Sequence, residues 1–304
     1  MSFRDIPRPF ICGVLIDDPT PDGVIRTMKL AEYEGADAFD LELQSLDPEF
    51  RSPAALKPLF DVATRPIFTV YRRYSLRGSN LVYAESNEET RMQAQLDLID
   101  LGSIGFDMEL DTFDPRPGPS NATEAGKRYS YDRDSPPREV SDDPQAIDRQ
   151  MRLIEATHRR GGEVLASAHT LTRLSPAGAL AIGRIAEARG ADAVKIVQFC
   201  ASDEDVVESL ESTVLLKCEL KIPYVMMAMG EYGKLNRIMA PLLGSMLIFA
   251  RQDYRPGGFL DQPPIRAMKA FYGNADFRIS RRAKSFLPSE LTVSAQAALL
   301  EAGR

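Results

Sequence analysis

The sequence predicts an α/β protein in which eight parallel strands close into a (β/α)8 TIM barrel, and three observations support this prediction. Short apolar runs rich in strand-forming residues recur at regular intervals along the chain. Helix-like stretches lie between most of these runs, and several of them end in glycine, which commonly terminates a helix. The motif Gly-Ala-Asp-Ala occurs at 35–38 and at 190–193, each time between a helix-like stretch and an apolar run. Strand alternating with helix indicates a parallel sheet.

The expected elements follow one another in a regular order. The first half of the chain supplies strand-like runs at 10–16, 37–43, 66–72 and 104–110. The second half supplies further runs at 163–169, 192–198, 223–229 and 245–250. Helix-like stretches occupy several of the intervals, at 21–35, 88–102, 144–162 and 176–190. This number of strands in about 250 residues favours the closed barrel, and a doubly wound open sheet stays as the alternative.

Two segments depart from this rhythm and divide the chain. Residues 112–142 are rich in proline, glycine and charge, and they follow the fourth strand, so they leave the face of the barrel where such enzymes carry their sites. A loop of this length is either a lid over the barrel mouth or a solvated surface loop. The polar tail at 273–304 is expected to be a C-terminal extension of a barrel that occupies 1–272.

Composition and charge disfavour several classes of function. The chain has 304 residues and a formal net charge of −7, so neither nucleic acid nor an anionic membrane is expected as a partner. No run approaches the length of a membrane span, and the N-terminal residues lack an apolar signal region. The three cysteines are far apart and without metal-type spacing, so reduced thiols and a cytoplasmic location are expected.

A single lysine interrupts the apolar run GADAVKIVQF at 190–199. Lys195 is expected to be buried there, and an ammonium in a protein core is costly unless it is paired or loses its proton. A buried neutral amine is a nucleophile toward a ketone, and the resulting iminium acidifies the adjacent C–H bond. An ion pair between Lys195 and a strand carboxylate is the structural alternative. The residue types alone leave both interpretations open.

Other polar residues stand where the expected strands reach the active face. His169 closes the run EVLASAH, and histidine is the natural proton shuttle near neutral pH. Glu109 lies at the end of the fourth run, and Asp40 and Glu42 lie at the end of the second. His158, the other histidine, lies near the end of a helix and is expected at the surface. A divalent metal would suit these carboxylates, but a single nearby histidine makes a metal site less attractive, and no metal is expected.

Four stretches resemble the type I 3-dehydroquinate dehydratase family, a class of (β/α)8 Schiff-base lyases. GADAVKIVQ is similar to the strand with the family's Schiff-base lysine, which corresponds to Lys195. LASAHTL resembles the segment with the catalytic histidine, at His169, and FDMELD resembles the strand whose glutamate lies beside it, at Glu109. MAMGEYGKLNRIMAPLLGSMLIFA is similar to a segment with a substrate-binding arginine, at Arg237. The resemblance extends over residues 10–272.

The chain departs from the family pattern at the expected substrate contacts. The family's second strand ends Glu-x-Arg, whereas residues 40–42 read Asp-Leu-Glu, so a negative group replaces a positive one. In the third strand, Tyr71 occupies the register of a family arginine, and Arg72 would need a bulge to reach the site. The family's closing loop Ser-x-Pro-Gly-Gln reads Tyr-Arg-Pro-Gly-Gly here, at 254–258. The resemblance therefore implies an altered set of substrate contacts, namely Arg237, Asp40, Glu42, Arg72, Tyr254 and Arg255.

The resemblance implies a lyase that eliminates water from a cyclic, 3-dehydroquinate-like β-hydroxy ketone through an iminium on Lys195. His169 would be the general base and acid, and Glu109 would orient and tune it. No cofactor is expected, because the lysine supplies the electron sink. The alternatives are the shikimate-pathway 3-dehydroquinate dehydratase itself with an altered pocket, and a catalytically silent regulatory or binding protein on the same scaffold. The expected partner is a small-molecule cyclic ketone, and the sequence is compatible with a homodimer.

Overall fold

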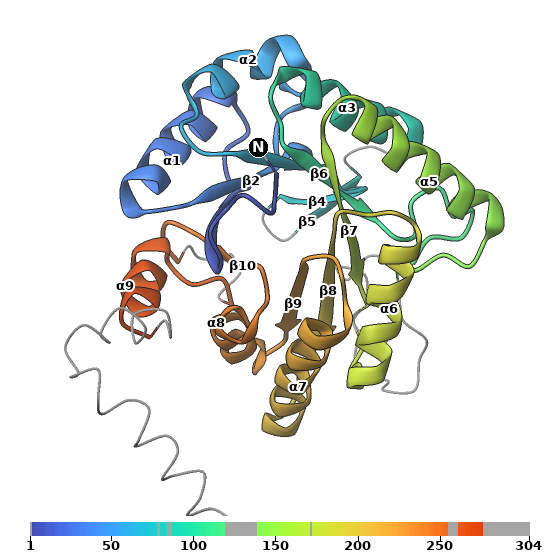
Figure 1. The fold of residues 1–304 in the computed structure, drawn as a ribbon. Helices are drawn as coiled ribbons and strands as arrows, with labels where there is room; N and C mark the ends of the chain where they lie inside the picture. Colours follow the sequence, from blue (N-terminus) through green and yellow to red (C-terminus); the bar gives the residue numbers. More distant parts are fainter. Residues whose placement is uncertain are drawn as a thin grey trace, which may run out of the picture.

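The computed structural model describes residues 2–77, 80–83, 87–118, 139–170, 172–254 and 261–275, and its centre is a TIM barrel of eight parallel strands (Figure 1). The barrel strands are β1 (Phe10–Leu15), β2 (Ala38–Glu42), β3 (Ile67–Val70), β6 (Gly105–Glu109), β7 (Glu163–His169), β8 (Ala193–Phe199), β9 (Tyr224–Met229) and β10 (Leu247–Ala250). Hydrogen-bonded neighbours follow the order β10-β1-β2-β3-β6-β7-β8-β9. The predicted fold class is confirmed.

The barrel is nearly closed between β9 and β10, the two ends of this order. The backbone N–H of Met246 donates to the carbonyl of Tyr224 over 2.7 Å. The backbone N–H of Met226 donates to the Ser245 hydroxyl over 3.1 Å. These bonds join β9 to the residues just before β10, whereas an open doubly wound sheet would leave both edge strands apart. The open-sheet alternative was therefore wrong.

Helices surround this ring of strands (Figure 1). They are α1 (Pro21–Glu34), α2 (Pro53–Val62), α3 (Glu88–Leu101), α5 (Pro144–Arg159), α6 (Pro176–Ala188), α7 (Asp203–Glu219), α8 (Gly233–Leu243) and α9 (Ile265–Ala275), with the short 3-10 turns η1 (Leu43–Ser45) and η2 (Pro48–Phe50). Helices α1 and α3 end at Gly35 and Gly102, whose φ angles of 104° and 119° favour glycine. The predicted glycine stops are confirmed at these two positions.

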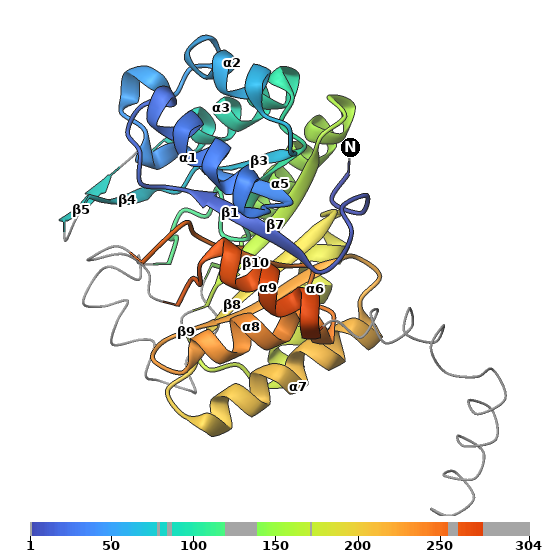
Figure 2. The same cartoon turned by 90° about the vertical axis from the view of Figure 1, so that its left-hand side faces the viewer.

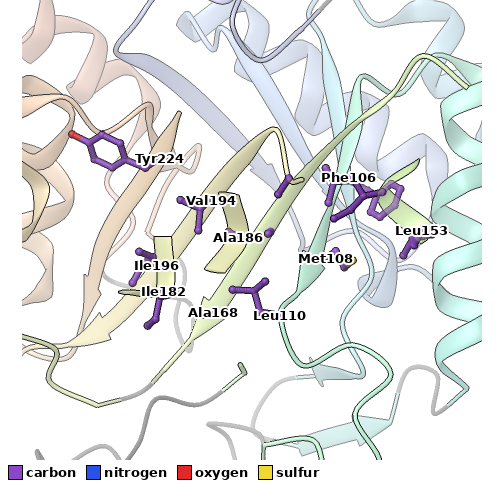
Figure 3. Packing of buried hydrophobic residues seen from close by; sticks show 14 of the residues in the cluster. Phe106, Met108, Leu110, Leu153, Ala168, Ile182, Ala186, Val194, Ile196 and Tyr224 are labelled. Carbon is purple, nitrogen blue, oxygen red and sulfur yellow. The ribbon is translucent and has the colours of Figure 1, made fainter. Parts of the chain in front are cut away.

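Alternation along the strands divides the apolar side chains into two layers. Inside the barrel, the buried residues Phe10, Phe68, Val197 and Phe249 belong to one cluster. Outside, the alternate strand residues pack against the helices, and Figure 3 shows this outer layer between β6, β7 and β8 and the helices α5 and α6. Burying one such side chain contributes roughly 1.5–3 kcal/mol. The layer to which a strand residue belongs therefore shows whether its side chain faces the barrel interior or the helices.

An antiparallel hairpin between β3 and α3 is a feature that the sequence analysis did not predict. It consists of β4 (Tyr74–Arg77) and β5 (Asn80–Tyr83). Figure 2 shows the hairpin at one end of the barrel and the N-terminal segment at the other. The N-terminal segment closes its end of the barrel, because the Phe3 ring lies edge-on against the interior residue Phe68 with ring centroids 5.7 Å apart. The opposite end, where the strands finish, is left for a functional site.

The predicted insertion and the predicted C-terminal extension are described only in part. Residues 119–138 of the insertion and residues 276–304 of the extension lie outside the described residues. The last described helix, α9, continues to Ala275. Among the described helices, none is both long and apolar enough to cross a membrane.

Candidate active site at the barrel mouth

Lys195 lies inside the barrel on β8, because its neighbours Val194 and Ile196 pack in the outer layer. Its side chain is only 6% exposed, and its Nζ lies 2.5 Å from Oδ2 of Asp107 on β6. The same nitrogen lies 5.4 Å from the centre of the Phe249 ring. The structure therefore contains the ion pair that the sequence left open. Any covalent chemistry of Lys195 starts from this pair.

Asp107 is held in place by donors on three sides. The Ser167 hydroxyl donates to its Oδ1 over 2.6 Å, and Nη2 of Arg72 lies 3.4 Å from the same oxygen. Burial alone would raise the pKa of Asp107, but Arg72 and Lys195 outweigh burial and hold this pKa below its ordinary value. Asp107 therefore stays ionised and balances a positive charge on Lys195.

Arg72 follows β3 and points into the barrel. Phe68 and Val70, at the preceding alternate positions, belong to the interior cluster, whereas Tyr71 belongs to the outer layer. Strand alternation alone therefore directs Arg72 inward. The predicted register, with Tyr71 in the site and Arg72 reaching it only through a bulge, was wrong.

The guanidinium of Arg72 connects the lysine and histidine parts of the cluster. Its Nη2 lies 3.1 Å from Nε2 of His169, and its Nη1 lies 3.1 Å from Oε1 of Glu109 and 3.5 Å from Oε2 of Glu139. A guanidinium can only donate, so Nε2 of His169 accepts this hydrogen bond. The ring proton of the neutral imidazole is therefore on Nδ1.

His169 ends β7 and is bound by Glu139 on its other side. Its Nδ1 lies 2.8 Å from Oε2 of Glu139, and the same oxygen accepts the backbone N–H of His169 over 2.7 Å. Burial lowers the pKa of His169 well below its ordinary value, and the positive charges of Arg72 and Lys195 add to the shift. Burial raises the pKa of Glu139 to about 7. The imidazole is therefore neutral at neutral pH.

Glu109 does not make the histidine contact that was predicted for it, because Glu139 occupies that place. Instead, Oε2 of Glu109 accepts hydrogen bonds from both terminal nitrogens of the fully buried Arg91, each over 3.3 Å. Burial opposes ionisation, but Arg91 and Arg72 hold the pKa of Glu109 below its ordinary value. Glu109 thus fixes Arg72, which contacts His169, and its negative charge also partly opposes the lowering of the pKa of His169.

Asp40 and Glu42 lie on β2 and add further acids to the barrel interior. Burial, and then repulsion from Glu42, raises the pKa of Asp40 well above its ordinary value. Among the described residues, Oδ1 of Asp40 is buried without a hydrogen-bond partner. Burial also raises the pKa of Glu42, which accepts a hydrogen bond from Gln44. This strand therefore presents acceptors to whatever enters the barrel.

The remaining predicted substrate contacts have partners outside this cluster. Nη2 of Arg237 on α8 lies 2.7 Å from Asp261, and its Nε donates to the carbonyl of Ala228 over 2.8 Å. Tyr254 is 46% exposed, and its hydroxyl accepts from Lys234 over 2.5 Å. Within the described residues, no hydrogen bond or ion pair joins Arg237 or Tyr254 to Lys195. The predicted contact Arg255 lies outside the described residues.

Sequence reasoning missed several members of the cluster, namely Asp107, Ser167, Arg91 and Glu139. The two that lie in strands were recoverable, because each stands two positions before a predicted site residue and so shares its face. Arg91 lies on a helix, and Glu139 lies at the end of a long insertion. No local pattern indicates that Arg91 reaches the barrel mouth, and the lid alternative for the insertion singled out no residue that contacts His169.

Fold and cluster together define a (β/α)8 barrel protein with a buried lysine, an ionised carboxylate and a neutral histidine, at the end of the barrel where such proteins carry active sites. The profile of the type I 3-dehydroquinase family matches residues 12–275. The chain therefore belongs to this family.

Curated relatives match parts of the chain. A 3-dehydroquinate dehydratase from Alkaliphilus oremlandii is 36% identical over 101 residues, which are 32% of this chain and 39% of the relative. A 3-dehydroquinate dehydratase from Aromatoleum aromaticum is 28% identical over 134 residues, which are 43% of this chain and 49% of the relative. The chain thus spans less than half the length of these relatives.

Solved structures share the fold over most of the chain. The 3-dehydroquinate dehydratase of Geobacillus kaustophilus has a TM-score of 0.67 at 20% identity, with 90% of this chain and 96% of that one covered. The enzyme of the same name from Enterococcus faecalis has a TM-score of 0.62 at 16% identity, with 88% and 95% covered. At these identities the likeness shows a common barrel.

Proposed function

We propose that this protein is a Schiff-base dehydratase that removes water from a cyclic β-hydroxy ketone through an iminium on Lys195. The observation that carries the proposal is the pairing of buried Lys195 with ionised Asp107, in a network that also holds neutral His169. Membership of the type I 3-dehydroquinase family supports it, and so do the relatives that carry the name 3-dehydroquinate dehydratase.

Imine formation begins at the Lys195–Asp107 pair. The ammonium of Lys195 passes a proton to the neutral imidazole of His169, and the resulting amine attacks the ketone carbon. The imidazolium then returns the proton to the carbinolamine hydroxyl, which leaves as water and gives an iminium. The iminium carries the same single positive charge as the ammonium it replaces. Asp107 can therefore stabilise both species without moving, since Ser167 and Arg72 hold its carboxylate.

Elimination uses the imidazole of His169. Its Nε2 lone pair becomes available when Arg72 transfers its hydrogen bond to the substrate, and it then removes the proton adjacent to the iminium to give an enamine. The imidazolium returns that proton to the β-hydroxyl, which leaves as water. Hydrolysis of the conjugated iminium releases the enone and regenerates Lys195, so the net change is the loss of a water molecule.

Glu139 is a positioning residue in this scheme. Its carboxylate holds Nδ1 and the backbone N–H of His169, which fixes the tautomer that leaves Nε2 free to act as a base. The same carboxylate stabilises the imidazolium that forms during elimination. One histidine can then serve as base and acid in turn.

Turnover assays test the function. Purified protein is incubated with 3-dehydroquinate and with a panel of keto-cyclitols, and the conjugated enone is followed in the ultraviolet. At least one ketone should be dehydrated, and Lys195→Ala should abolish the reaction. Lys269→Gln is the matched control, because this lysine lies on the surface beside Asp37. A catalytically silent binding protein would dehydrate none of the ketones, and that result would contradict the proposal.

The setting of the reaction is also part of the proposal. We place it in the cytoplasm, which the cysteines of the described chain support, because Cys12, Cys200 and Cys218 are all free thiols. A homodimer stays a prediction from the sequence, and native mass spectrometry measures it.

A further inference from the structure

Several guanidiniums near the C-terminal ends of the strands already hold carboxylates of the chain itself. Three pairs show this: Arg72 with Glu109 at 3.1 Å, Arg237 with Asp261 at 2.7 Å, and Arg251 with Asp17. To bind at any of these three guanidiniums, a carboxylate on a substrate would have to displace the internal acid. That exchange leaves a buried acid without its counter-ion, which opposes binding.

Two acids of β2 are in the opposite situation, because neither forms an ion pair with a side chain in the described part of the chain. Asp40 is 3% exposed, and its Oδ1 has no hydrogen-bond partner within the described part of the chain. Glu42 stands two positions further along the same face and accepts from the neutral amide of Gln44. A buried acceptor without a donor is unfavourable, so a ligand hydroxyl that donates to Oδ1 of Asp40 would remove this cost.

Asp40 and Lys195 face the same interior. Phe39 and Leu41, the neighbours of Asp40, pack in the outer layer, so Asp40 points inward as Lys195 does. The ammonium of Lys195 also opposes the burial that raises the pKa of Asp40 and of Glu42. A ligand bound to Lys195 therefore shares the barrel interior with both acids.

We propose that the substrate is a keto-cyclitol, an uncharged polyhydroxylated ring ketone that presents adjacent hydroxyls to Asp40 and Glu42 and carries no carboxylate. This inference rests on the proposed Schiff-base function of Lys195 and names the substrate class of that site. Two neighbouring hydroxyls supply two donors, which matches a pair of acceptors on one strand face. Asp40 and Glu42 become the residues that determine specificity.

The charge of β2 favours this class over a carboxylate-bearing ring. The family's strand ends Glu-x-Arg, and Glu42 stands at the position of that arginine. A donor has therefore become an acceptor, and an anionic substrate meets repulsion where the family offers a cation. Hydroxyl groups meet no such repulsion, because they donate to either form of a carboxylate.

The proposed chemistry balances with a keto-cyclitol. The carbon next to its ketone carries the proton that His169 removes, and the following carbon carries the hydroxyl that leaves as water. The iminium on Lys195 holds the electron pair between these two events and releases it again. The ring loses a water molecule and becomes an enone, with no oxidant or reductant involved.

Competing substrates test the inference directly. Steady-state kcat/KM is measured with the inososes, which are six-membered keto-cyclitols, and with 3-dehydroquinate. The wild-type protein should prefer at least one inosose by roughly 10-fold or more, and Glu42→Arg should move the preference toward 3-dehydroquinate by roughly 10–100-fold. Glu42→Gln is the second variant, because it keeps the size of the side chain and should lower the preference without adding a cation.

The outcomes separate this inference from the function on which it rests. A wild-type preference for 3-dehydroquinate, or a preference that neither Glu42 variant moves, overturns the substrate class and leaves the Schiff-base function standing. Failure of every ketone to react, with no adduct on Lys195 after borohydride reduction, overturns the function and the substrate class together. A preference for an inosose that falls in both variants establishes the inference.

Discussion

Nδ1 of His169 lies 2.8 Å from Oε2 of Glu139, and Glu139 belongs to the insertion at 112–142, for which the sequence left a lid and a surface loop open. The same oxygen also accepts the backbone N–H of His169 over 2.7 Å, so one carboxylate fixes both the ring and the end of β7. The described end of the insertion therefore contributes to the candidate site. A residue from a connecting segment can thus orient a histidine that stands at the end of a strand.

Glu139→Gln should lower kcat by roughly 10–100-fold while KM changes little, because the carboxamide still accepts a hydrogen bond but no longer stabilises the imidazolium. Steady-state kinetics on the substrate identified in the turnover assays measures the split. Glu89→Gln is the matched control, since Glu89 is 71% exposed and pairs with Arg149 at the surface. Equal effects of the two variants on kcat would contradict a positioning role for Glu139.

His169 should remain a neutral imidazole at pH 6.5, because burial and two neighbouring cations lower its pKa well below the ordinary value of 6.5. Nitrogen NMR of a ¹⁵N-histidine sample reads the charge and the tautomer together. The chain has only two histidines, so His158→Gln leaves His169 as the single signal. The spectrum should show a protonated Nδ1 and an unprotonated Nε2. A titration midpoint at or above 6.5 would count against the account.

The stability of Glu139→Gln relative to wild type should depend on pH. The pKa of Glu139 rises from 4.5 to about 7 on burial, so the protonated carboxyl stabilises the fold below pH 4.5, and this contribution is lost as the pH rises to about 7. The variant lacks this titrating group. Its free energy of unfolding, relative to that of the wild type, should therefore rise by about 1–3 kcal/mol between pH 4.5 and pH 7.5. Urea unfolding at both pH values measures the difference, and a constant difference would show that Glu139 does not titrate in this window.

Asp107→Asn should destabilise the protein by about 3–5 kcal/mol, because it leaves the buried ammonium of Lys195 without its counter-ion. Asp61→Asn is the control, since Asp61 is 56% exposed and its pair with Lys57 on the same helix contributes about 0–1 kcal/mol. Denaturant unfolding compares the two variants with the wild type. Similar losses in both would mean that the buried pair contributes no more than a surface pair.

Strand alternation explains how much of this site could be predicted from the sequence. The apolar neighbours of Lys195 indicated its burial, and the run at 163–169 coincides with β7, so the place of His169 at a strand end was predictable. The approximate strand bounds were predictable for the same reason, since the apolar residues of one run alternate between the two packed layers.

Residues outside that alternation were not predictable in the same way. Arg72 was placed by resemblance to an arginine position, although counting from Phe68 and Val70 puts it on the inner face. Glu139 reaches His169 from 30 positions away in sequence, and no local pattern encodes such a contact. The hairpin strands β4 and β5 are only four residues long, which is shorter than the apolar runs of six or seven residues from which the barrel strands were predicted.

The most direct test of the central claim is borohydride reduction of the protein while it turns over its ketone, followed by peptide mass spectrometry. The account predicts a secondary amine that joins the substrate skeleton to Lys195, formed in the wild type and absent from Lys195→Ala. Trapping of the substrate on a different lysine, or the absence of any adduct with a ketone that the protein dehydrates, would contradict the Schiff-base mechanism.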